Sequence, residues 1–186
     1  TADKPDVMIL SAADYDRCAE ATEEAIAAGI GVVAIDTDVN AAGRACFVGS
    51  NSYEIGLEMG RAMASYLPEG GKVAVIQHML TTTTGIERTR GVLDALNEAG
   101  NIEILGSFCC DNSTEQAQTI TTELLSADPE IRGFVCTNEV CNVGAANALV
   151  ELGMGGRVYV VGCDNSQRQI QFLEQNIIQA IVTQRP

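Results

Sequence analysis

The sequence predicts an α/β fold built from doubly wound parallel sheets. Short runs of Val, Ile and Ala alternate along the chain with stretches whose apolar residues recur at helical spacing. The short runs are apolar throughout, which is typical of parallel strands buried on both faces. The chain has 186 residues, of which 46% are hydrophobic and 19% charged. This length and composition fit one average domain, or one large domain and part of another, with a substantial core.

The first 50 residues hold three predicted strands and one helix. The strands are 7–10, 31–35 and 46–49, and the helix lies between the first two at 14–28. Apolar residues recur along this helix at spacings that place them on one face, and Gly29 ends it. The order strand, helix, strand predicts a parallel pair joined by a crossover helix.

From residue 52 onward, five more strands alternate with five helices. The predicted helices are 52–67, 85–99, 113–126, 139–152 and 166–175, and the predicted strands are 72–77, 102–108, 133–136, 158–162 and 178–183. Ser52 is the expected N-cap of the first helix, which ends at the turn 68–71. A threonine-rich loop, 81–84, follows the first strand. This regular alternation predicts helices on both faces of a parallel sheet.

The charge excludes several classes of partner. The chain has 11 basic and 25 acidic residues, a net charge of −14. Contacts with phosphate groups need clustered Lys and Arg, so we expect no nucleic-acid partner and no binding to an anionic membrane surface. No apolar run approaches the ~18 residues of a membrane span, and we expect any signal peptide to be absent or already removed. A small-molecule or protein partner remains.

The seven cysteines and the glycine motifs predict neither a metal site nor a nucleotide cofactor. No C-x-x-C occurs, and His78 is the single histidine, so neither a zinc site nor a Cys–His catalytic pair has a supporting pattern. The turns 70–72 and 153–156 precede strands, whereas phosphate-binding glycine loops precede helices. Three cysteines lie within strand runs, where we expect small buried hydrophobes: Cys46, Cys136 and Cys163. Plentiful unpaired thiols indicate a reducing compartment or an anaerobic source.

Polar residues follow most of the predicted strands. They are Asp14, Asp36, Gln77, His78, Asn138, Asp164, Asn165 and Gln184. Arg88 follows in the first turns of the helix after the threonine loop. Ligands of open parallel sheets bind beyond the carboxyl ends of the strands, and carboxylates, amides and a guanidinium suit the neighbouring hydroxyls of a polyol. The alternative is that the Asp and Asn residues only cap the next helices.

These strand ends offer no nucleophile with a convincing base, so we expect a binding protein and not an enzyme.

Six segments carry a resemblance to a known family. They are 33–38 (VAIDTD), 47–56 (FVGSNSYEIG), 87–96 (ERTRGVLDAL), 137–149 (TNE, with GA and AL downstream), 160–166 (VVGCDNS) and 182–186 (VTQRP). In this order and spacing, nearly the whole chain resembles the type I periplasmic solute-binding proteins of sugar ABC transporters, in particular the ribose-binding branch.

The resemblance implies a sugar site between two doubly wound lobes that close by hinge motion. Asp36 matches the amino-lobe Asp that holds sugar hydroxyls, and Arg88 matches the Arg of the E-R motif. Asn138 matches the Asn of the N-D/E motif, and Asp164 matches the Asp of the V-G-x-D motif. Gln184 matches the Gln before the last crossing between lobes. The ligand-binding set implied by the family therefore coincides with the polar strand ends.

Three positions depart from the ribose-binding pattern. Thr37 stands where ribose binders place an Arg, and Asn112 falls about where an aromatic ring would stack on the sugar. Both are included in the expected ligand-binding set, and both argue against ribose itself. Cys163 replaces the usual Phe beside Asp164, which we expect to loosen or enlarge the pocket.

The resemblance also implies a chain that is truncated at both ends. By the match, 1–49 form part of the amino-terminal lobe, 50–184 form the carboxyl-terminal lobe, and 185–186 begin the return crossing. We therefore expect one near-complete lobe and part of a second. An incomplete amino lobe would expose apolar faces, so self-association is also expected.

The function implied by the resemblance is delivery of a small sugar or polyol to an ABC permease or a membrane sensor, outside the cytoplasm. The alternative is the effector-binding domain of a LacI-type transcriptional regulator, which shares this fold. The acidic charge and the lack of a helix-turn-helix segment in these residues disfavour it. An enzyme on a flavodoxin-like fold is a third and weaker alternative.

Overall fold

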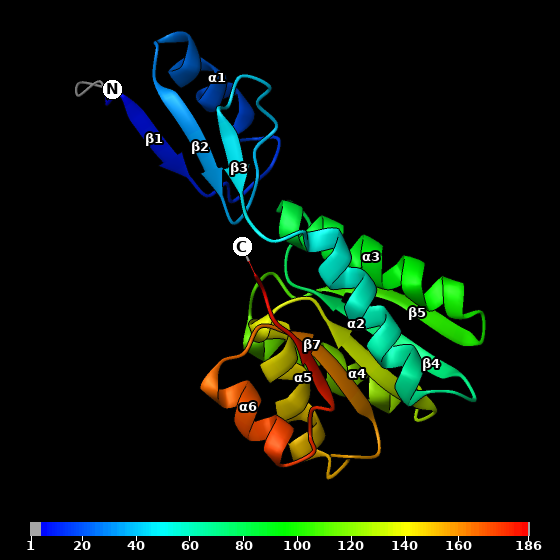
Figure 1. Cartoon of the computed structure of the whole chain (residues 1–186). Coiled ribbons are helices and arrows are strands. Elements are labelled where there is room, and N and C mark those ends of the chain that lie inside the picture. The colour runs from blue at the N-terminus through cyan, green and yellow to red at the C-terminus, as the bar shows by residue number, and fades with distance from the viewer. Residues whose placement is uncertain (1–4, 186) are drawn as a thin grey trace.

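Two separate parallel sheets organise residues 5–185, which are the residues that the computed structural model describes (Figure 1). The predicted start of the return crossing, 185–186, lies partly outside this range. The smaller sheet has the order β1-β2-β3, and helix α1 packs on one face of it. Its elements are β1 (Val7–Leu10), α1 (Ala19–Ala27), β2 (Gly31–Ile35) and β3 (Cys46–Val48).

The larger sheet is parallel, with the order β5-β4-β6-β7-β8. Its strands are β4 (Gly71–Gln77), β5 (Ile102–Cys109), β6 (Ile131–Cys136), β7 (Tyr159–Cys163) and β8 (Ala180–Val182). Its helices are α2 (Ser52–Tyr66), α3 (Thr83–Ala99), α4 (Thr114–Ala127), α5 (Glu139–Glu151) and α6 (Gln167–Glu174). Helices α2 and α3 cover one face and α4, α5 and α6 cover the other. The predicted doubly wound α/β class is confirmed.

The core lies in two layers, one on each face of the larger sheet. Successive residues of β4 point to opposite faces, so Val73 and Val75 pack against α2 and α3, while Ala74 and Ile76 pack toward α4 and α5. The second layer contains Phe134 and other fully buried side chains. Strands β4, β6 and β7 are therefore apolar and buried over most of their length, as the sequence pattern predicted, whereas edge strand β5 carries the exposed Glu103 and Ser107.

One predicted helix start and one predicted N-cap are wrong for local reasons. The helix predicted from Asp14 begins at Ala19, because the Asp14 carboxylate accepts hydrogen bonds from the Asp16 and Arg17 amides and stabilises a turn instead. Asn51, and not Ser52, caps α2, and its side chain accepts from the Glu54 amide at 3.2 Å. The other bounds agree with the prediction to within two residues.

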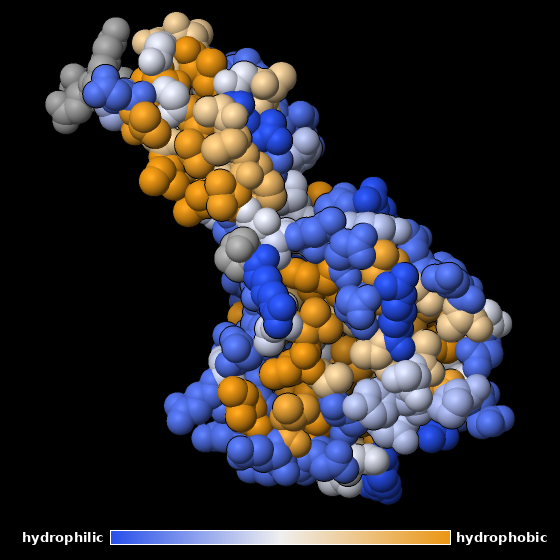
Figure 2. All heavy atoms as spheres, in the orientation of Figure 1, coloured by the Kyte–Doolittle hydropathy of each residue, from blue (hydrophilic) through white to orange (hydrophobic). Residues whose placement is uncertain are grey.

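The smaller sheet is covered by a helix on one face only. Its other face exposes apolar side chains, seen as the orange surface of the upper part of Figure 2. These are Val7, Ile9, Ile35 and Val48, whereas the exposed Phe47 pairs with Ala34 and points to the other face. Cys46 is also exposed, which contradicts the expectation that it is buried, because β3 is an edge strand of this half-covered sheet. Cys136 and Cys163, in the larger sheet, are buried as expected.

Loops connect the two sheets around the cleft between them. The chain crosses near Gly49–Asn51, and the Arg185 amide donates to Ser50 Oγ at 3.0 Å, so the last described residues lie beside this crossing. The threonine loop reaches the smaller sheet, where Thr83 Oγ1 accepts from the Asp38 amide at 2.9 Å. Among residues 5–185, no helix has the length and apolarity of a membrane span.

Candidate functional site

A polar cavity of about 250 Å³ lies where the carboxyl ends of the strands of both sheets meet. All seven residues of the expected ligand-binding set line it: Asp36, Thr37, Arg88, Asn112, Asn138, Asp164 and Gln184. Four further residues also line it: His78, Met79, Thr82 and Thr84. The structure therefore brings the expected set together around one cavity, and the role of each residue in binding a ligand stays a prediction.

The cavity lies at the topological switch point of the larger sheet. The chain runs from β4 out to the edge strand β5 and then returns to β6 on the other side of β4, and this reversal leaves a crevice beyond the strand ends. Three of the cavity residues there have left-handed backbone, namely Asp36 (φ 60°), Asn112 (φ 56°) and Asp164 (φ 78°). Asp and Asn adopt this conformation more readily than other non-glycine residues, and such positions cluster at functional sites.

Arg88 is the cation of the cavity and is only 3% exposed. It lies on the second turn of α3, and its Nη1 donates to the Thr137 carbonyl at 2.9 Å. Its Nε has no hydrogen-bond partner within residues 5–185, and no carboxylate there forms an ion pair with the guanidinium. A buried guanidinium with unused donors is costly unless a ligand accepts from them.

The Asp164 carboxylate is held by its neighbours from both sides. Its Oδ2 accepts from the Glu139 amide at 3.1 Å, at the start of α5, and its Oδ1 accepts from Gln184 Nε2. Gln184 follows β8, so this contact joins the ends of two neighbouring regions of the rim. The carboxylate is therefore oriented before any ligand arrives, and each oxygen keeps acceptor capacity.

Asn138 acts both as a helix cap and as part of the cavity. Its Oδ1 accepts from the Cys141 amide at 3.0 Å and so caps α5, while its Nδ2 donates to Asn112 Oδ1 at 3.0 Å. Asn138 is thus a helix cap, as the alternative expects, but it is also part of the cavity wall. The Asn112 amide group retains its own donors for a ligand.

Asp36 and Thr37 differ in what they can offer to a ligand. Thr37 is 7% exposed, and its hydroxyl already donates to the Ala12 carbonyl at 2.7 Å. The Asp36 side chain is exposed to the cavity, and its carboxylate accepts no hydrogen bond within the described residues. Asp36 is therefore an available acceptor, whereas Thr37 chiefly shapes the wall.

Three polar strand-end residues of the sequence analysis do not line the cavity. Asp14 stabilises the turn before α1, and Gln77 is buried and donates to the Met79 carbonyl at 2.9 Å. Asn165 is exposed. Sequence reasoning placed His78 at a strand end but left it out of the expected set. It missed Thr82 and Thr84 because the loop 81–84 was assigned no role, although this loop follows a strand at the correct end of the sheet.

His78 is a neutral hydrogen-bonding residue of the cavity wall. Its Nδ1 lies 2.7 Å from Thr137 Oγ1 and its Nε2 lies 3.2 Å from Thr84 Oγ1. Burial, with the nearby charge of Arg88, lowers the pKa of His78 to about 4. At neutral pH the ring therefore adds no charge to the cavity, and Arg88 is the cation that the cavity presents.

We expect His78 to make the fold weaken in acid. Between pH 7 and pH 4 the unfolded chain binds a proton at His78, with a pKa of about 6.5, which the folded chain does not accept until about pH 4. The free energy of unfolding should thus fall as the pH drops through this window. His78→Gln should reduce the fall between pH 7 and pH 4.5 by about 2 kcal/mol, measured by urea denaturation of both proteins. An identical fall in both would show that His78 does not titrate in this way.

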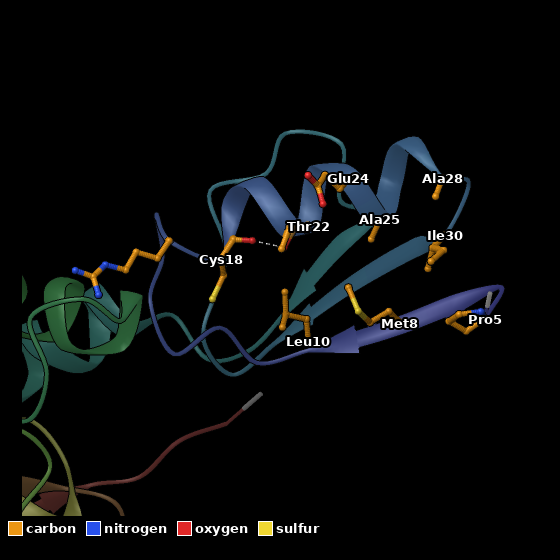
Figure 3. Close-up of a pocket in the computed structure, with 11 residues that line it drawn as sticks. Pro5, Met8, Leu10, Cys18, Thr22, Glu24, Ala25, Ala28 and Ile30 are labelled. Carbon is orange, nitrogen blue, oxygen red and sulfur yellow. Dashed lines mark hydrogen bonds between the residues drawn. The ribbon is translucent and has the colours of Figure 1, made fainter. Parts of the chain in front are cut away.

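A second and larger cavity lies in the smaller sheet and has different chemistry. Its volume is about 620 Å³, and it opens between α1 and strands β1 and β2 (Figure 3). Met8 and Leu10 rise into it from β1, opposite Ala25 of α1. This groove has few groups that could bind hydroxyls, so its size does not make it the polar-ligand site.

Within residues 5–185, His, Cys, Asp and Glu side chains do not gather in a group that could hold a metal ion.

Parallel sheets in two units, with a polar cavity beyond their strand ends, define the architecture of the bilobal α/β binding folds. The chain belongs to the periplasmic binding protein domain family, whose model matches residues 1–186. This confirms the family resemblance of the sequence.

Individual relatives bind sugars. The chain is 30% identical over 118 residues to the D-allose-binding periplasmic protein of Escherichia coli, covering 63% of this chain and 38% of that one. It is 28% identical over 168 residues to the D-ribose/D-allose-binding protein of Pseudomonas aeruginosa, covering 87% and 52%. It superposes on GanP, a glucose-galactose binding protein from Geobacillus stearothermophilus, with a TM-score of 0.93 and 27% identity over 98% of this chain and 65% of that one.

The chain thus spans about half the length, or less, of these two curated relatives. The relatives are binding proteins rather than enzymes, and they do not favour the LacI-type alternative.

Proposed function

We propose that this protein binds a small sugar or polyol in the 250 Å³ cavity. The observation that carries the proposal is the buried Arg88 guanidinium, which lines a cavity rich in carboxylates and amides and whose Nε has no hydrogen-bond partner within residues 5–185. The volume is below the ~300–1,000 Å³ of sites for drug-sized ligands, so a monosaccharide suits it better than a larger molecule. The family membership and the sugars bound by the relatives support the same class of ligand.

The polar groups divide the recognition of hydroxyls between donors and acceptors. Arg88 donates to ligand oxygens, while Asp36 and Asp164 accept from ligand hydroxyls. Asn138 and Asn112 orient each other, and Gln184 orients the Asp164 carboxylate. Thr37 closes the wall beside Asp36. Because Asp36 comes from the smaller sheet and the other charged groups from the larger one, a ligand here would bridge the two.

We further propose that 1–49 and 50–184 act as two lobes whose closure on the sugar is what the partner recognises. The hydrogen bond of Thr83 to the Asp38 amide crosses the cleft in this arrangement and supports a closed form. By analogy with the family, the partner would be an ABC permease or a membrane sensor, and the protein would act outside the cytoplasm. The net charge of −14 suits a neutral ligand and disfavours a nucleic-acid partner.

A thermal-shift screen with pentoses, hexoses and polyols tests the proposed ligand class. A sugar present at 100 times its dissociation constant should stabilise the chain by about 2.7 kcal/mol and raise its unfolding temperature accordingly. Amino acids of similar size serve as the control ligands. The absence of a shift with every sugar and polyol, or an equal shift with amino acids, would contradict the proposal.

We also propose that these 186 residues self-associate through the uncovered face of the smaller sheet. Ile9 is 69% exposed and Val7 58% exposed on this face. Light scattering after size exclusion should show dimers or larger species whose fraction rises with concentration. Ile9→Glu should lower that fraction, while the control Val150→Glu, at a 50% exposed site on α5, should not. A strict monomer at high concentration would contradict this proposal.

A further inference from the structure

Two cysteines lie in contact beneath the rim of the polar cavity. The sulfurs of Cys110 and Cys141 are 3.4 Å apart, and both side chains are fully buried. Within residues 5–185, no other two cysteine sulfurs lie within hydrogen-bond distance of each other. We propose that Cys110 and Cys141 form a disulfide that joins two strand-end segments of the rim.

The backbone around both cysteines is held in place, so the sulfurs face each other in the folded chain. The Cys110 amide donates to the Gln77 carbonyl at 2.9 Å, just beyond the end of β5. Cys141 lies in the first turn of α5, and its amide donates to Asn138 Oδ1. A disulfide needs the sulfurs to approach by about 1.4 Å more, to about 2.0 Å, a movement within reach of small side-chain rotations.

The local chemistry favours Cys110 as the attacking sulfur. The Cys141 thiol and nearby backbone amides, through hydrogen bonds to the Cys110 sulfur, lower the pKa of Cys110 to about 7. Burial raises the pKa of the Cys141 thiol well above its usual value. The unequal pair resembles thiols in which one sulfur is the nucleophile and the other resolves the intermediate.

The reaction is thiol–disulfide exchange with a small-molecule disulfide such as oxidised glutathione. The Cys110 thiolate attacks one sulfur of that disulfide, forms a mixed disulfide and releases the first thiolate. The Cys141 thiol loses its proton and attacks the Cys110 sulfur, which releases the second thiolate. The two protein thiols are thereby oxidised, and the external disulfide is reduced to two thiols.

The proposed disulfide would join the same two segments that the hydrogen bond between Asn112 and Asn138 already joins. Asn112, two residues after Cys110, accepts from Asn138, three residues before Cys141. The disulfide would link the same two segments covalently and fix the spacing of Asn112 and Asn138. The inference concerns the fold of the rim and stands whether or not the cavity binds a sugar.

Refolding in a redox buffer tests the proposal without requiring an oxidant to reach the buried pair. The full chain is unfolded in urea under reducing conditions and refolded at low protein concentration with reduced and oxidised glutathione. Titration of thiols in denaturant should then give five in place of seven. Cys110→Ala and Cys141→Ala should each keep six thiols, whereas the controls Cys109→Ala and Cys136→Ala should each fall from six to four.

A second measurement remains informative if a variant folds poorly. Oxidised wild-type chain should unfold roughly 10 °C higher than reduced chain, because the bond closes a loop of about 30 residues in the unfolded state. Seven thiols in the refolded wild type, or the same thiol loss in Cys110→Ala or Cys141→Ala, would overturn the proposal. Disulfide-linked peptides from a digest of the oxidised wild type that contain Cys109 or Cys136 would overturn it as well.

Discussion

Arg88→Met should abolish most of the stabilisation that a sugar gives to this protein. Methionine has a similar length but no donors, so the ligand oxygens would lose a charged partner in a buried site. A loss of roughly 100-fold in affinity is expected. A sugar that stabilises the wild type by about 2.7 kcal/mol should then stabilise the variant by about 0.4 kcal/mol at the same concentration. Thermal shift and calorimetric titration measure both values.

Arg90→Met is the matched control on the same helix. Arg90 is exposed, stacks on the Tyr53 ring at 4.4 Å and pairs with Glu87, outside the cavity. Its replacement should leave sugar affinity within about twofold of the wild type. If Arg88→Met kept wild-type affinity while remaining folded by circular dichroism, the assignment of Arg88 to the site would be wrong.

Gly56→Ala should destabilise the fold by about 3 kcal/mol, because α2 and α3 touch at this glycine. A Cβ on Gly56 would overlap the Arg88 carbonyl oxygen, and one on Gly60 would lie 2.7 Å from the Ala95 Cβ. In a solvent-exposed helix the same change would stabilise the fold by up to about 1 kcal/mol. A destabilising effect would therefore indicate that α2 and α3 are in contact at Gly56. The displaced backbone is that of Arg88, so sugar affinity should fall as well.

Gly29→Ala provides the control for a backbone effect without a packing clash. Gly29 has φ +86° and no atom within 4 Å of an added Cβ, so only the strain of a left-handed alanine remains, about 1 kcal/mol. Urea denaturation should therefore rank Gly56→Ala as the more destabilising of the two. A Gly56→Ala protein at least as stable as the wild type would show that α2 and α3 lie farther apart than described.

The strands and the cavity rim could be predicted from sequence because each depends on a short-range pattern. Apolar runs marked the strands β4, β6 and β7, and the polar residue after each of these runs marked one edge of the sheet. Since parallel strands all end at the same edge, residues such as Asp36, Asn138 and Asp164 converge without any knowledge of side-chain positions.

What could not be predicted depends on contacts between distant segments. The exposure of Cys46 follows from the uncovered face of the smaller sheet, which a local apolar run does not reveal. The place of His78 in the cavity wall depends on its contacts with Thr84 and Thr137. Thr137 follows the end of β6 and lies 59 residues from His78 in the sequence. That Thr37 donates its hydroxyl to Ala12, and so has less to offer a ligand, also requires the tertiary structure.

A crystal structure with the sugar that gives the largest thermal shift would test most directly whether the polar cavity is the ligand site. We expect one monosaccharide in the 250 Å³ cavity, with its oxygens within hydrogen-bond distance of the Arg88 guanidinium and the Asp36 carboxylate. Both sheets would then contribute to one site. A sugar bound instead in the apolar groove beneath α1, or contacts with neither Arg88 nor Asp36, would contradict this account.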